Sequence, residues 1–182
     1  VSMFANSVFN KTISSWRVSN VTSMKDMFKN SEFNQSISTW DVSNVINMEG
    51  MFENSSFNQP INNWNISNVT NIKNMFKSTL FNQNIGGWNT SNVTQISGLF
   101  EDAIAFNQDI NNWDVSKVTD LSRVFSGATN YNKPIDTWDV SKVTSMSSMF
   151  NDAIAFDQDL SSWDVSKVEK MDSTFFNAAI FN

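Results

Sequence analysis

Residues 106–120 read FNQDINNWDVSKVTD, and closely related phrases return along the whole chain, beginning at Phe33, Phe57, Phe81 and Phe156. The tryptophans mark the period. They are spaced 24, 24, 24, 25, 25 and 25 residues apart, at Trp16, Trp40, Trp64, Trp88, Trp113, Trp138 and Trp163. A fixed period in this range indicates repeats that stack on one another. We therefore predict a single repeat domain over residues 1–182, with about seven coils, that forms a segment of a longer array.

Residues 22–45 serve as one repeat. Thr22 precedes Met24, Met27 and Phe28, an i, i+3, i+4 apolar stripe that predicts a short helix with Thr22 as its N-cap. Ile37 lies among short polar residues, which predicts a brief strand. The expected fold is an α/β solenoid with one short parallel strand and one short helix per repeat. Its strands would be centred near Ile13, Ile37, Ile61, Ile85, Ile110, Ile135 and Leu160.

The repeat FNQ-x-I-x-x-W-[DN]-[VIT]-S-[NK]-V-T-x-M-x-x-MF resembles that of the BspA-like surface proteins, relatives of the leucine-rich repeats that are common in bacterial surface lipoproteins. The resemblance covers essentially the whole chain. It implies a right-handed, leucine-rich-repeat-like α/β solenoid that is displayed outside the cell and acts in adhesion or in binding host or matrix proteins. It offers no catalytic residues to carry over to this sequence.

Composition narrows the possible functions. The chain has no histidine and no cysteine, which removes the usual general base and thiolate metal sites. The net charge of −6 makes nucleic acid an unsuitable partner. Carboxylate pairs such as Asp157 and Asp159 lie in repeated surface positions without an evident cleft. We therefore expect neither an enzyme nor a bound cofactor.

Targeting signals are absent from the sequence itself. No apolar run approaches the roughly 20 residues of a membrane-spanning helix. The first ten residues, VSMFANSVFN, have neither a basic segment nor an apolar one of the secretory type. We expect a cell-surface or secreted protein whose signal or anchor lies outside this chain.

The tryptophans have two possible roles. Exposed rings in a row would suit sugar faces, whereas a residue in the same slot of every coil suits a shared core. Flanking Ile and Val residues favour the second reading. We therefore assign to the structural core Trp40, Trp64, Trp88, Trp113, Trp138 and Trp163.

An Asp/Asn column follows the tryptophans. Stacked carboxylates would suit calcium, and the candidates are Asp114, Asp139 and Asp164. Asx turns, in which each side chain accepts backbone N–H groups, are the alternative. The asparagines at two of these positions and Arg17 in the first repeat favour the turns. Lys117, Lys142 and Lys167 follow these carboxylates and are expected to neutralise them on a solvated face.

Two further columns carry polar groups. The asparagine of each FN step is expected to satisfy turn backbone groups. Residues that flank the strand isoleucine vary between repeats, so they could hold specificity. This candidate binding face comprises Ser36, Ser38, Asn62, Asn63, Asn84, Asp109, Asn111, Asn112, Asp136 and Asp159. A flat, hydrated face suits a protein or glycan surface, although it could also be a merely soluble exterior.

The leading hypothesis is a non-enzymatic cell-surface or extracellular repeat protein that mediates adhesion or protein or glycan binding. The alternative is a structural subunit of a head-to-tail filament, formed by end-to-end self-association. One detail concerns the change from 24 to 25 residues. The segment FEDAIAF, residues 100–106, holds one residue more than earlier repeats, and we expect the addition in the turn between helix and strand.

Overall fold

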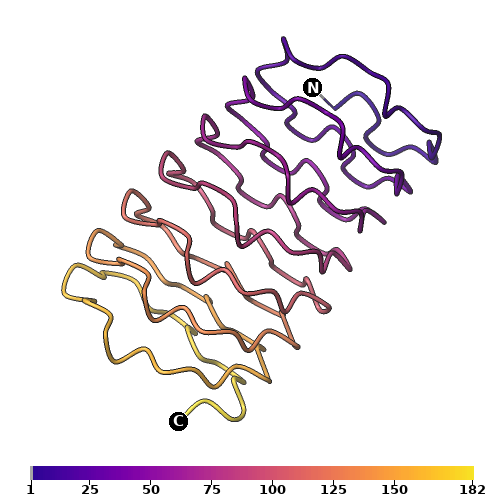
Figure 1. Ribbon diagram of the computed structural model, residues 1–182. Helices are drawn as coiled ribbons and strands as arrows, with labels where there is room; N and C mark the ends of the chain where they lie inside the picture. Colours follow the sequence, from indigo (N-terminus) through magenta and orange to yellow (C-terminus); the bar gives the residue numbers. More distant parts are fainter. Residues whose placement is uncertain (1) are drawn as a thin grey trace.

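The computed structural model describes residues 2–182 as a stack of successive coils (Figure 1). The chain progresses from one end of the stack to the other, so its two termini lie far apart (Figure 1). The backbone hydrogen bonds between coils join residues 23 to 26 positions apart. The sequence period is therefore the length of one coil.

The α/β prediction is wrong. In the described part of the chain no residue lies in a helix, and the only parallel pairing consists of isolated bridges. These bridges link Ser23, Asn47, Asn71 and Gln95, then Asp120, Ser145 and Lys170. They lie where the helices were expected to begin, and no sheet runs through the isoleucines. The leucine-rich-repeat assignment therefore fails together with the helix and the strand.

The segment expected to be helical forms consecutive β-turns instead. The Met27 N–H donates to the Met24 carbonyl at 3.1 Å, which closes the first turn. Alternate amides point along the stack: those of Met24, Asp26 and Phe28 donate to the next coil at 2.8–2.9 Å. In an α-helix these N–H groups would bond within the segment. Here they hold two coils together.

Left-handed residues explain why no helix forms. Two positions per coil, four residues apart, have φ between 51° and 68°, whereas every residue of an α-helix has φ near −63°. Most of these residues are Gly, Asn, Asp or Ser, several of which adopt positive φ at low cost. The positions are Ser2, Asn6, Asp26, Asn30, Gly50, Asn54, Asn74, Ser78, Gly98, Asp102, Arg123, Gly127, Ser148, Asp152, Ser173 and Asn177.

The threonine column also has another role. The Thr22 carbonyl accepts the Ile46 N–H of the next coil at 2.8 Å, and the Thr70 N–H donates to the Ile46 carbonyl at 2.9 Å. Thr22 is thus a link between coils rather than a helix cap. Its backbone bonds run in the opposite direction along the stack from those of residues 24–30.

Tryptophan side chains replace the expected sheet at the isoleucines. The Trp64 indole Nε1 donates to the Ile37 carbonyl of the preceding coil at 3.2 Å, and that carbonyl also accepts the Trp40 backbone N–H at 3.1 Å. The same indole bond recurs at 3.1 Å for Trp40, Trp88, Trp113, Trp138 and Trp163. One indole therefore satisfies its own donor while it fastens two coils.

Aromatic rings form two columns through the core. In the column of Phe28 and Phe52, rings of successive coils lie 5.4–5.9 Å apart. A second column contains Phe33 and Phe57, and each ring stacks on its neighbour in the same coil at 3.8–4.3 Å. Offset stacking of this kind adds to the gain from burial.

The extra residue of the longer coils lies in a turn between the two core phenylalanines, as between Phe100 and Phe106. In the shorter coils the Ser55 Oγ accepts the Phe57 N–H at 3.3 Å. In the longer coils alanine takes this place, and the Phe106 N–H donates to the Ala103 carbonyl at 3.0 Å. The residue is thus added within a turn, but the predicted enlargement of a helix-to-strand turn is wrong, because neither a helix nor a strand flanks it. The addition coincides with the interruption of the bridges between Gln95 and Asp120.

Tyr131 replaces a phenylalanine of the second column. Its ring is fully buried, and its hydroxyl has no hydrogen-bond partner among the described residues. Burial, with a smaller contribution from the charge of Asp109, raises the pKa of Tyr131. This hydroxyl is a local defect in an otherwise apolar column.

We expect Trp88→Ala to lower the free energy of unfolding by about 3–5 kcal/mol, because a large buried side chain is lost. Trp88→Phe should cost less, since the Ile61 carbonyl keeps the Trp64 backbone N–H at 3.1 Å. Urea unfolding of both variants measures the difference. A Trp88→Phe variant as stable as the parent would contradict the fastening role of the indole bond, because phenylalanine keeps an aromatic ring but lacks the N–H donor.

We expect Tyr131→Phe to raise the free energy of unfolding by about 1–3 kcal/mol, because a buried hydroxyl without a partner is removed. Phe106→Tyr, in the same column one coil earlier, is the reverse control and should destabilise. Thermal unfolding provides the measurement. A loss of stability in Tyr131→Phe would mean that the hydroxyl has a partner in solution.

Candidate binding surfaces

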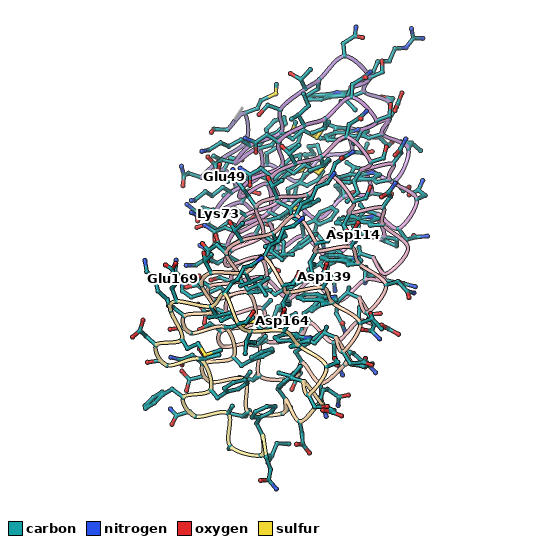
Figure 2. All side chains as sticks on the ribbon, turned by 90° about the vertical axis from the view of Figure 1, so that its left-hand side faces the viewer. Glu49, Lys73, Asp114, Asp139, Asp164 and Glu169 are labelled. Atoms are coloured by element: carbon teal, nitrogen blue, oxygen red, sulfur yellow. The ribbon has the colours of Figure 1, made fainter. Side chains whose placement is uncertain are left out.

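The calcium candidates form a column on the outside of the stack. Asp114, Asp139 and Asp164 follow one another from coil to coil (Figure 2). Each accepts, through Oδ1, the backbone N–H of the serine two residues later, at 2.9–3.1 Å. This is the Asx-turn geometry. Bonds from Ser116, Ser141 and Ser166 lower the pKa of the three carboxyl groups.

Lysines moderate repulsion within this column. The charge of Asp139 raises the pKa of Asp114, and the charge of Lys117 lowers it. Lys142 and Lys167 act in the same way on Asp139 and Asp164. Over residues 2–182 no three carboxylates gather as a metal-binding group. The arrangement stabilises turns and supplies no convergent cluster of ligands.

The tryptophans assigned to the core are 3–4% exposed at Trp40, Trp64, Trp88, Trp113 and Trp138, and Trp163 is half-buried. Their ring faces are therefore not presented to solvent as a row. The FN asparagines also act between coils. The Asn34 Oδ1 accepts the Asn58 N–H at 2.9 Å and the Gln59 Nε2 at 3.1 Å. The Gln of the FNQ phrase thus has a partner that sequence reasoning did not assign.

The candidate binding face is solvent-exposed at most positions: Ser36, Asn62, Asn63, Asn84, Asp109, Asn112, Asp136 and Asp159, with Ser38 and Asn111 half-buried. Several of its polar groups are already engaged. Asn84, Asp109 and Asp159 accept N–H groups of their own turns at 2.8–3.0 Å. Asn63 and Asn111 bond to neighbouring coils at 2.8 and 3.0 Å. Much of this face therefore stabilises the stack.

A groove that sequence reasoning missed runs across three coils in the N-terminal half. It encloses about 500 Å³ and is lined by Asn20, Thr22, Asn44, Ile46, Asn68 and Thr70. The alternation of outward Asn and Thr around a buried valine, as in Asn68-Val69-Thr70, was the available signal. The groove has no ionisable group in its lining.

Ion pairs between lysine and glutamate join successive coils on the outside of the stack, and the sequence pattern did not predict them. Lys29 pairs with Glu53 at 2.9 Å, and Lys77 pairs with Glu101 at 2.8 Å, each with its partner one coil further on. Lys25 pairs with Glu49 at 3.0 Å, and this contact raises the pKa of Lys25. Glu49 and Lys73 lie at the left of the stack in Figure 2. Exposed pairs of this kind contribute little stability.

The C-terminal coil carries an apolar pocket of about 220 Å³, whose lining includes Leu160, Trp163 and Phe175. End-to-end self-association was the expectation for such a face, and it stays a prediction. In the part of the chain that the structure describes, no helix is long and apolar enough to cross a membrane.

One family model matches the chain in two overlapping segments. The family described as "Mycoplasma protein of unknown function, DUF285" matches residues 1–112 and 77–182. The chain belongs to this family. No curated protein and no solved structure matches the chain. Membership of DUF285 supports a repeat protein, and it does not support the specific BspA-like leucine-rich-repeat assignment.

We expect replacement of Asp41, Asp114, Asp139 and Asp164 by asparagine to flatten the acid dependence of stability. Serine bonds lower the folded-state pKa of all four carboxyl groups. Their stabilising contribution is therefore complete above the unfolded pKa of about 3.9 and is lost as pH falls through the lower folded values. Asn65 and Asn89 form the same turn, at 3.1 Å.

Melting temperature measured between pH 6 and pH 2 tests this expectation. Glu32→Gln is the control, because Glu32 is exposed and its carboxylate makes no hydrogen bond to the described residues. If the melting temperatures of the parent and of the fourfold variant fall in parallel below pH 4, the expected role of these carboxylates is wrong.

Proposed function

We propose that this DUF285 chain is a non-enzymatic recognition module that acts at the cell surface or outside the cell, in adhesion. The groove across three coils is the observation that carries this proposal, because it is an open recess that extends over successive repeats. A recess of this shape suits an extended ligand better than a small enclosed substrate.

The chemistry of the exterior supports binding over catalysis. The Asp column, the most prominent set of carboxylates, is occupied in Asx turns whose hydrogen bonds lower the carboxyl pKa values. A general acid would need the opposite shift. The repeat itself resembles that of BspA-like surface proteins, which supports a location outside the cell.

Surface display and adhesion form one test. Antibodies raised against the chain should label intact cells of the organism that encodes it, without permeabilisation. Beads coated with the chain should adhere to mammalian cell layers at least several-fold more than beads coated with albumin. Labelling only after permeabilisation, or adhesion equal to the albumin beads, would overturn the proposal.

A further inference from the structure

We propose that the groove lined by Asn20, Thr22, Asn44, Ile46, Asn68 and Thr70 binds an uncharged glycan chain that runs along the stack. This inference rests on the proposed recognition function and names its ligand class. Three observations lead to it: the free acceptors in the groove, the apolar patch between them, and the charges that limit it.

Asparagine oxygens form one wall of the groove. The Asn44 Nδ2 donates to the Ser19 carbonyl at 2.8 Å, and the Asn68 Nδ2 donates to the Ser43 carbonyl at 2.8 Å. These bonds fix each amide so that its nitrogen is used within the stack. The Oδ1 atoms of both residues accept no hydrogen bond from the described residues. The wall therefore presents acceptors one coil apart, about 4.8 Å.

The next position of the same column shows what these acceptors take. The Asn92 Nδ2 donates to the Ser67 carbonyl at 2.9 Å, as in the groove, while its Oδ1 accepts the Lys117 Nζ at 2.9 Å. The lysine that replaces asparagine in the next coil thus occupies an acceptor of the kind that is free in the groove. The ligand should supply N–H or O–H donors in a row.

The threonine hydroxyls on the other side of the groove also present acceptor oxygens. The Thr70 Oγ1 points to the Ile46 carbonyl at 3.4 Å, and the Thr94 Oγ1 to the Thr70 carbonyl at 3.3 Å. Because the hydroxyl protons are directed to the preceding coil, the oxygens face a ligand as acceptors. Ile46, 49% exposed, takes the place of a threonine in this column, between Thr22 and Thr70, and offers a surface for the apolar face of a sugar ring.

Charge sets the limits of the site. The groove columns are neutral from Asn20 to Thr94, and then lysine replaces asparagine at Lys117, Lys142 and Lys167, and Glu169 replaces threonine. An anionic polymer would find no cation in the neutral segment and would meet acceptor oxygens there. Hydroxyl groups match the acceptors without a charge to desolvate. An uncharged glycan is therefore the ligand class that the groove fits.

The test uses maltohexaose, cellohexaose and chitohexaose as uncharged probes and a heparin hexasaccharide as the charged one, each titrated calorimetrically into the full chain. We expect at least one uncharged probe to bind. Ile46→Glu should weaken that binding by at least tenfold, because it places a carboxylate in the groove. Glu169 occupies the equivalent position of the last coil, so the fold accepts the substitution.

Thr119→Glu is the matched control, in the same exposed column but outside the groove, and should bind like the parent. Melting curves verify that both variants are folded. Binding of heparin alone, no binding of the uncharged probes, or equal effects of the two variants would overturn the glycan proposal. Bead adhesion that persists in Ile46→Glu would leave the recognition function standing while the groove assignment fails. If beads coated with the parent chain adhere no better than albumin beads, the proposed recognition function is wrong.

Discussion

Backbone N–H groups that point along the stack are the constraint on which the rest of this structure depends. Met24, Asp26 and Phe28 each donate to the next coil instead of to their own segment. A coil with these donors unpaired would leave buried polar groups without partners, at a cost comparable to several lost hydrogen bonds. Every coil is therefore stable only against a neighbour, and the indole bonds at the isoleucines reinforce the same dependence.

Much of the architecture could be read from the sequence because repetition reports it directly. The period, the buried aromatic columns and the turn at Asp114-Val115-Ser116 follow from residue types at fixed spacing. The helix was misread because the Met24, Met27 and Phe28 spacing that suits a helical face also suits two successive turns. Gly50 and Gly98 within the supposed helices were the contrary signal, since glycine disfavours a helix interior.

The groove escaped sequence reasoning for a different reason. Each of its residues belongs to a column that also serves the stack, so no single position looks functional. Only coordinates show that the Asn44 amide nitrogen is occupied while its oxygen is free. The strand expected at Ile37 failed similarly, because a side-chain donor from Trp64 replaced the backbone donor that a sheet would have used. Which of two chemically equivalent donors serves a carbonyl is decided by packing.

The opposed directions of the hydrogen bonds between coils have an electrical consequence. The amides of Met24 and Phe28 point toward the C-terminal end, whereas those of Ile46 and Thr70 point toward the N-terminal end. The two sets are unequal, because Asp26 and Asn30 also donate toward the C-terminal end, so their dipoles oppose one another only in part. The fully aligned peptide dipoles of an α-helix leave about half a charge at each end, and the opposed bonds of this stack reduce that effect. Side chains add an asymmetry of their own: six basic and five acidic residues before position 101, and six basic and thirteen acidic residues from there on.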